Sequence, residues 1–234
     1  MNNYDKNMKE IEATVQSDHV FHLSSPSKVS LKSKCSFGLP AGPAFSCPKA
    51  TRACKNCYAK KGRFAFKTVS KALMKNWKLV KEYEAQNKFD RMVKKLSKSI
   101  PNNSTIFRIH TVGDFYSQFY LDVWTEIIRQ NPKISFWAYT RSFDLNFQRI
   151  VRLPNYNMFV STDQYNKQEA EGFVQRYAKS HIRFAYGPCA HDVTLPDGAV
   201  ICPVTNKTLK SDGACEKCKI CIKKEGKNVV FLKH

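Results

Sequence analysis

Residues 105–140 read TIFRIHTVGDFYSQFYLDVWTEIIRQNPKISFWAYT, and this stretch decides the class of fold. Its first segment, residues 105–110, is short and rich in β-branched and aromatic side chains, which predicts a strand. Residues 118–129 carry apolar side chains at helical spacing, and residues 134–139 predict a second, aromatic strand. Two strands joined through a helix are typical of a parallel crossover, so we expect an α/β protein with a parallel sheet.

The same alternation continues on both sides of this unit. It predicts strands at residues 29–39, 157–160 and 182–186, helices at 66–85, 89–99 and 168–178, and a short helix that Asp144 would cap and that ends at Val151. We expect an arm at residues 1–26 and the α/β domain at 27–187. Residues 188–234 are rich in turn signals and cysteines. They predict a small metal-binding module that closes the domain and ends in a strand at 228–232.

Charge is the strongest signal in the composition. The 234 residues include 39 Lys and Arg against 19 Asp and Glu, a net charge of +20. Such a field attracts polyanions, so we expect a nucleic acid or a nucleotide as partner, although a solubility role would give the same balance. No apolar run reaches the roughly 18 residues that span a membrane. The polar N-terminus does not resemble a signal peptide, so we expect a cytoplasmic protein.

Nine cysteines without a secretion signal favour metal binding over disulfides. Cys215, Cys218 and Cys221 have C-x2-C-x2-C spacing, and the remote Cys202 precedes a proline. This resembles the ligand pattern of a four-iron, four-sulfur (4Fe-4S) cluster. Zinc is the alternative, since four thiolates also suit it. Cys189 could replace one of these ligands.

A second group, Cys47, Cys54 and Cys57, has C-x6-C-x2-C spacing after the strand expected at 29–39. Three thiolates on a 4Fe-4S cluster leave one iron free to bind a substrate or cofactor. A zinc site would instead need a fourth ligand, for which Cys35 is the nearest choice. Cys35 could equally be a core cysteine.

The position of this loop resembles that of the cluster loop in radical S-adenosylmethionine (radical SAM) enzymes, and Gly113-Asp114 follows the next strand as their acidic motif does. The segments LPAGPAFSCP, ACKNCYAKKGRF, RIHTVGDFYS and FWAYTRS, with the C-terminal cysteines, resemble the phage gene product 88 family. The resemblance covers about residues 28–225. It implies a partial TIM-like (βα)6 barrel of radical SAM type, with a C-terminal cysteine-rich metal module.

The resemblance also implies roles for single residues. Cys47, Cys54 and Cys57 would hold the catalytic cluster, and Asp114 would meet the amino group of SAM. His110 and Arg141 would join Asp114 in catalysis, and cofactor contacts would come from Thr140, Arg141, Ser161 and Asp163. Capped turns, salt bridges and a structural histidine are the alternatives for these residues.

Together these observations predict an iron–sulfur enzyme that binds two 4Fe-4S clusters, cleaves SAM reductively and acts on a nucleic acid or nucleotide. Such an enzyme needs an electron donor, and a phage protein would work in the cytoplasm of its bacterial host. The alternative is a non-catalytic iron–sulfur or zinc protein that binds nucleic acid or a host partner. The C-x6-C-x2-C spacing favours this alternative, because radical SAM enzymes usually have C-x3-C-x2-C. A role in electron transfer is a third possibility.

Overall fold

The computed structural model describes residues 3–23, 35–196, 198–223 and 226–233. Its α-helices are α1 (Asn3–Thr14), α2 (Lys67–Ala85), α3 (Phe89–Ser99), α4 (Gln118–Gln130), α5 (Lys167–Arg176) and α6 (Ala214–Cys218). Its strands are β1 (Ile106–Arg108), β2 (Ser135–Thr140), β3 (Tyr156–Thr162), β4 (Ile182–Cys189), β5 (Ala199–Ile201) and β6 (Asn228–Leu232). Short 3-10 turns are η1 (Arg52–Asn56), η2 (Tyr58–Lys60), η3 (Gly62–Ala65) and η4 (Ile150–Arg152).

The strands form one sheet in the order β1-β2-β3-β4-β6-β5, and every neighbouring pair is parallel. This confirms the α/β class and the parallel sheet. Residues 35–39 extend the sheet beyond β1. Ser36 bridges Arg108 in parallel, and the Leu39 amide donates to the Val112 carbonyl at 2.9 Å. These residues belong to the strand expected at 29–39, of which 29–34 lie outside the described residues.

Most other predicted elements lie within a few residues of the observed ones. The helix expected at 144–151 was wrong, because the structure has turns there and only the 3-10 turn η4. The Asp144 carboxylate forms an ion pair with Lys49 at 3.0 Å instead of capping a helix. The sequence also gave no sign of β5. The strand β6 lies between β4 and β5, so residues from the expected module form part of the main sheet.

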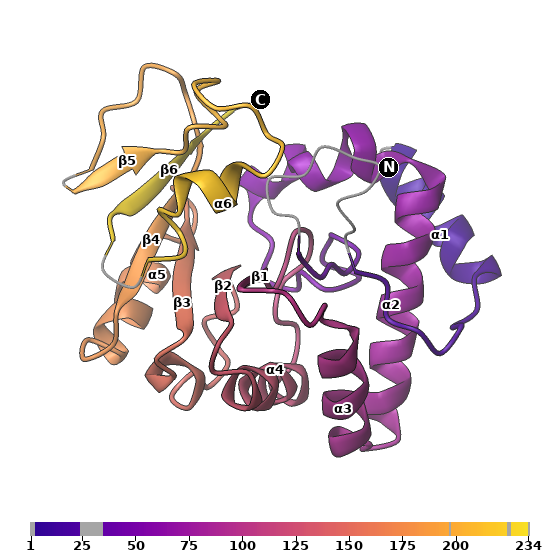
Figure 1. Cartoon of the computed structure of the whole chain (residues 1–234). Helices are drawn as coiled ribbons and strands as arrows, with labels where there is room; N and C mark the ends of the chain where they lie inside the picture. The colour runs from indigo at the N-terminus through magenta and orange to yellow at the C-terminus, as the bar shows by residue number, and fades with distance from the viewer. Residues whose placement is uncertain (1–2, 24–34, 197, 224–225, 234) are drawn as a thin grey trace.

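Helices α3 and α4 cover one face of the sheet and pack against each other (Figure 1). Helix α4 begins after Ser117, whose hydroxyl accepts the Tyr120 amide as an N-cap. It buries Trp124 completely against Phe37 and Phe107. This large apolar core fixes the sheet from the helical side.

The opposite face of the sheet has a smaller apolar cluster of Phe159, Ala185 and Val229. Cys202 and Cys221 pack against this cluster, and α6 lies over the sheet in Figure 1. The sheet therefore separates a helical layer from a cysteine-bearing layer. At the other end of the molecule, α1 packs on α2 and buries Met8 and Ile11. The expected N-terminal arm thus begins with a packed helix.

Candidate functional site

The three-cysteine loop follows the carboxyl end of the strand run at 35–39 and is tied to the ends of two other strands. Thr51 donates its hydroxyl to Asp163, just after β3, at 2.7 Å. Asp163 also forms an ion pair at 2.7 Å with Arg141, just after β2, and both side chains are mostly buried. The Thr51 hydroxyl lies 3.8 Å from the Cys54 sulfur. A polar chain therefore runs from Cys54 to the carboxyl edge of the sheet, the usual location of chemistry in parallel α/β folds.

The thiols of this loop are half-buried and near one another. Cys47 and Cys57 pack against Ala41, Leu73 and Val112. Burial raises the pKa of Cys47 to about 12, with further contributions from Asp114 and Cys57. Burial also raises the pKa of Cys57, and the neighbouring Cys54 adds to this effect. Cys47 and Cys57 therefore keep their protons at neutral pH.

The Gly113-Asp114 turn packs directly on the cysteine loop. Gly113 has φ +97°, and a Cβ there would lie 2.5 Å from the Ser46 hydroxyl, so no other residue fits. Ser46 donates in turn to the Pro40 carbonyl at 2.7 Å. The three-cysteine loop and the Gly113-Asp114 turn, which the sequence places after successive strands, are therefore in contact.

Asp114 uses both carboxylate oxygens on the backbone. One oxygen accepts the Phe115 amide at 2.7 Å, and the other accepts the Arg141 amide at 2.8 Å. Burial raises the pKa of Asp114 to about 6, against the opposing effect of these hydrogen bonds and that of Thr140. In this arrangement, the carboxylate joins the ends of β1 and β2 and positions Arg141.

The other residues expected at this edge are arranged differently. His110 is buried, and its Nε2 lies 3.0 Å from the Tyr120 hydroxyl on α4. Burial, with the nearby Arg108, lowers the pKa of His110 to about 3, so the imidazole stays neutral. Thr140 is buried and accepts the Ser142 amide at 3.0 Å. Ser161 is half-buried, and its carbonyl accepts the Asn166 side chain. Arg141 and Asp163 thus come together with the cysteine loop, whereas His110 belongs to the helical layer.

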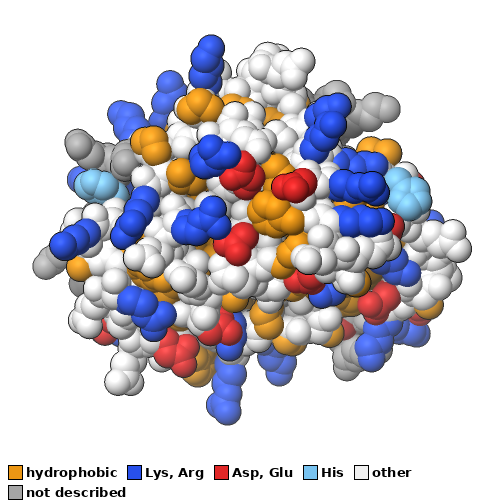
Figure 2. Space-filling view, turned by 90° about the horizontal axis from the view of Figure 1, so that it is seen from below, with side chains coloured by type: hydrophobic (Ala, Val, Ile, Leu, Met, Phe, Trp, Pro, Cys, Tyr) orange, Lys and Arg blue, Asp and Glu red, His pale blue; other side chains and the backbone are white. Residues whose placement is uncertain are grey.

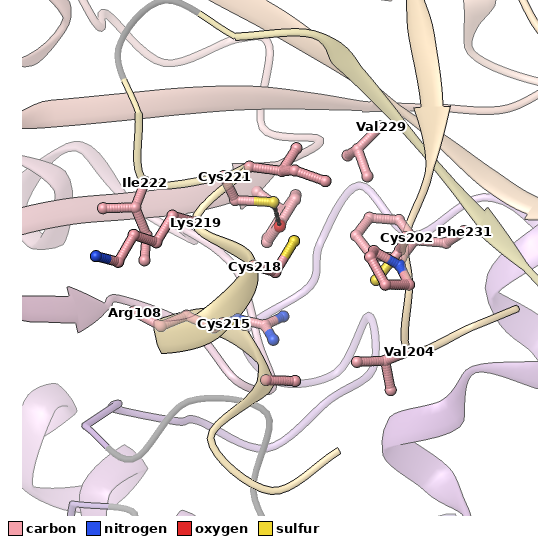
Figure 3. A pocket seen from close by; sticks show the side chains of 14 residues that line it. Arg108, Cys202, Val204, Cys215, Cys218, Lys219, Cys221, Ile222, Val229 and Phe231 are labelled. Atoms are coloured by element: carbon pink, nitrogen blue, oxygen red, sulfur yellow. Dashed lines mark hydrogen bonds between the residues drawn. The ribbon is translucent and has the colours of Figure 1, made fainter. Parts of the chain in front are cut away.

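The C-terminal cysteines all line one pocket on the other layer of the sheet (Figure 3). Cys202, Cys215, Cys218 and Cys221 surround it together with Arg108 and Tyr139. The Tyr139 hydroxyl donates to the Cys221 sulfur at 2.9 Å. Burial raises the pKa of Cys215 to about 12 and that of Cys221 to about 11. Cys202 lies 13 positions before Cys215, and Arg108 and Tyr139 lie still further away along the chain, yet all of them line this one cavity.

Two polar side chains of the sheet hold the Cys221 segment in place. Arg183 on β4 donates to the carbonyls of Ile220 and Lys223, both at 2.9 Å. Asn157 on β3 donates to the Ile222 carbonyl at 2.7 Å. These contacts tie the backbone of residues 220–223 to β3 and β4.

The two remaining cysteines lie elsewhere. The Cys35 sulfur is 3.2 Å from the Ser104 hydroxyl, just before β1, whereas the three-cysteine loop follows the other end of the Cys35 strand run. Cys189 ends β4, and Cys202 rather than Cys189 lines the C-terminal pocket. The structure thus favours the core-cysteine interpretation for Cys35, and Cys202 as the fourth residue of the C-terminal set.

The donor chemistry of the pocket suits a compact inorganic group. The cavity encloses about 30 Å³, far less than the roughly 300–1,000 Å³ of organic ligand sites. Within the described residues, no group of three or more His, Cys, Asp or Glu side chains is arranged to hold a metal ion. Sulfurs on one zinc ion would lie about 3.8 Å apart, given bonds of about 2.3 Å in a tetrahedron. A 4Fe-4S cluster lies between its thiolates and keeps them further apart, so four thiols around a cavity fit it in kind and number.

Sequence analysis missed Arg108, Asn157 and Arg183 as parts of this site. Each is a polar residue with an apolar residue on either side of it in the strand, and each faces the cysteine layer. Their neighbours Phe107, Met158 and Phe184 belong to the core under the helices. Because side chains alternate between the two faces of a strand, a polar residue between two apolar ones could have been used to predict which residues face the cysteines.

The fold and the site define an α/β protein with a parallel sheet and two separate groups of cysteines. The chain belongs to the gene product 88 family, whose model matches residues 3–224. It is 35% identical over 214 residues to the Gene 88 protein of Mycobacterium phage L5, covering 84% of this chain and 85% of that protein. It is 32% identical over 215 residues to the Gene 88 protein of Mycobacterium phage D29, with the same coverage. No solved structure matches it.

The membership supports the phage origin expected from the sequence motifs. None of the described helices combines the length and the apolar composition that crossing a bilayer requires.

Proposed function

We propose that this chain is an iron–sulfur protein with radical SAM-type activity on a nucleic acid or nucleotide. The observation that carries the proposal is the convergence of Cys202, Cys215, Cys218 and Cys221 on one small cavity. Buried thiols with raised pKa values give up their protons readily only to a metal, which then stabilises the fold around it. A 4Fe-4S cluster is the group that we assign to this cavity, with zinc as the alternative.

The second part of the proposal concerns Cys47, Cys54 and Cys57, which would hold a further 4Fe-4S cluster with one open iron. We propose that the parallel sheet, extended by residues 35–39, is a partial TIM-like barrel with this loop at its carboxyl edge. SAM bound to an open iron supplies a reductive, one-electron cleavage of its sulfonium group, for which an electron donor is needed. The loop is already joined to that edge through Thr51 and Asp163.

The charged residues at this edge would orient the cofactor. Arg141 is the group suited to the SAM carboxylate, because its guanidinium forms a fork of donors. Asp163 pairs with Arg141 and accepts from Thr51 through one oxygen, and the Tyr165 amide donates to the other, so its role in this proposal is to hold Arg141 beside the loop. In this revised assignment Asp114 positions the Arg141 backbone rather than touching SAM.

The nucleic-acid part of the proposal is supported by the distribution of charge. Residues 19–81 contain fourteen Lys and Arg and no Asp or Glu, and they include the whole three-cysteine loop. The face seen in Figure 2, below the helices of Figure 1, has acidic side chains set among the basic ones. A polyanion is therefore expected at the cysteine loop and α2, where no acidic residue of the same segment repels it.

The experiment that tests the proposal is a metal analysis of protein purified without oxygen. Two 4Fe-4S clusters give about eight irons per chain, and a spin-resonance spectrum of the reduced protein that changes when SAM is added. Zinc in place of iron, or iron with a spectrum that SAM leaves unchanged, would contradict the radical SAM activity.

The non-catalytic alternative is favoured by one observation, the engagement of both Asp114 oxygens by backbone amides. In that case both cysteine groups are structural, and the protein binds nucleic acid or a host partner. This alternative predicts a nucleic-acid affinity that falls steeply with salt. The affinity would not depend on SAM or on metal bound to the three-cysteine loop.

A further inference from the structure

Arg108 lies between the two cysteine groups. On one side, its Nη2 is 3.4 Å from the Tyr58 hydroxyl, and Tyr58 directly follows Cys57. On the other side, its guanidinium stands over the Tyr139 ring, 5.1 Å from the centroid, in the pocket of the C-terminal cysteines (Figure 3). Its Nε donates to the His110 carbonyl at 2.7 Å, which holds the side chain in this direction.

The partners of this guanidinium are neutral. They are a backbone carbonyl, a hydroxyl and an aromatic ring, and Arg108 has no ion pair with a carboxylate in the part of the chain that the structure describes. Arg108 is half-buried, and a guanidinium that has lost part of its water is stabilised when an anionic group stands beside it. Arg108 lines the same small pocket as Cys215, Cys218 and Cys221, so a group bound by these thiols would lie beside its guanidinium.

We propose that Arg108 is the counter-charge of the group held by Cys202, Cys215, Cys218 and Cys221, and that it sets the affinity and the reduction potential of that group. This inference rests on the proposed metal site. Four thiolates give a net negative charge to either a zinc ion or a 4Fe-4S cluster. One-electron reduction makes the charge of the cluster more negative, so a fixed cation beside it favours the reduced form.

Tyr139 completes this environment. Its hydroxyl donates to the Cys221 sulfur, and its ring lies under the Arg108 guanidinium. A hydrogen bond to a ligand sulfur acts on the potential in the same direction as the cation. Arg108 is therefore a positioning residue, which acts on the ligands rather than on a substrate.

The test compares Arg108→Gln and Arg108→Lys with a matched control, Arg129→Gln. Arg129 lies on α4 with its guanidinium at the surface, so its change removes one positive charge far from the pocket. All variants also carry Cys54→Ser, which restricts loading to the C-terminal site. The measurements are metal retention against a chelator, the potential from a redox titration followed by spin resonance, and thermal unfolding as a check of folding.

We expect Arg108→Gln to lose metal at roughly tenfold lower chelator concentration and to shift the potential to a more negative value. Arg108→Lys restores most of both properties, and Arg129→Gln changes neither. If the site contains zinc, there is no reduction potential to measure, and metal retention against the chelator is the test of the inference. Unchanged retention in folded Arg108→Gln, with an unchanged potential where iron is bound, would overturn the inference and leave the metal site standing. A parent protein that binds neither iron nor zinc in this pocket would overturn the proposed function as well.

Discussion

The two cysteine groups differ in how the protein surrounds them. The C-terminal four line a small cavity together with Tyr139, Arg108 and Lys219, and Arg183 and Asn157 hold the backbone of residues 220–223 beside it. The N-terminal three lie in a chain of short 3-10 turns, tied through Thr51 to the charged pair of Arg141 and Asp163. The environment of the C-terminal four suits a bound group that stays in place and is largely screened from solvent. The environment of the N-terminal three offers charged side chains that can meet a ligand.

The largest expected effect comes from removing one ligand from each group. Cys218→Ser should abolish C-terminal metal binding and lower the free energy of unfolding by more than about 5 kcal/mol, because metal binding to such a module is coupled to its folding. Cys54→Ser should remove the N-terminal metal with a loss of about 1 kcal/mol or less, since that loop is held by other contacts.

Metal content and thermal unfolding of the two variants, measured without oxygen, check this difference. Equal destabilisation by the two changes, or loss of both metals in either variant, would contradict the division into a structural and a functional site. Serine is a close match in size to cysteine, so each variant tests the sulfur rather than the packing.

The next effect concerns the charged pair at the three-cysteine loop. Asp163→Asn leaves the buried Arg141 without its counter-ion and weakens the contact with Thr51. Breaking a buried pair by changing one partner costs about 3–5 kcal/mol, so the melting temperature should fall by roughly 6–20 °C for a chain of this length. Metal in the N-terminal site should decrease, while the C-terminal metal is unchanged.

Asp144→Asn is the matched control for this variant. Asp144 also pairs with a basic residue of the cysteine loop, Lys49, but both side chains are about half exposed. Exposed ion pairs contribute about 1 kcal/mol or less. A similar loss of stability and metal in the two variants would mean that the Arg141–Asp163 pair has no special role in holding the loop.

Much of this arrangement could be predicted from local sequence patterns. The period of the apolar residues predicted α2, α3 and α4 to within a residue or two, because long amphipathic segments depend mainly on their own spacing, and the strand expected at 228–232 is β6. The grouping of Cys215, Cys218 and Cys221 with Cys202 followed from spacing as well. The pocket that all four of them line agrees with it.

Other features depend on contacts between distant residues, and the sequence could not predict them. Asp114 stood where an acidic ligand for SAM was expected, yet the amides of Phe115 and Arg141 take both of its oxygens. Asp144 was expected to cap a helix, yet its carboxylate meets Lys49, and the residues that follow it form turns. In both cases the local sequence suggests one role for the carboxylate, whereas the folded chain gives it a distant partner, Arg141 for Asp114 and Lys49 for Asp144.

The smallest expected effect tests where a polyanion would bind. Lys55 and Lys61 are exposed, flank Cys57 and lie in the segment without acidic residues, whereas Lys94 and Lys98 are exposed on α3. Lys55→Gln with Lys61→Gln should reduce the slope of log affinity against log salt for a single-stranded oligonucleotide by about 1.4, if each contacts one phosphate. The α3 pair, Lys94→Gln with Lys98→Gln, changes the net charge equally and should leave the slope unchanged. Equal losses from both pairs would show that only the overall charge attracts the nucleic acid, and the proposed surface at the three-cysteine loop would be wrong.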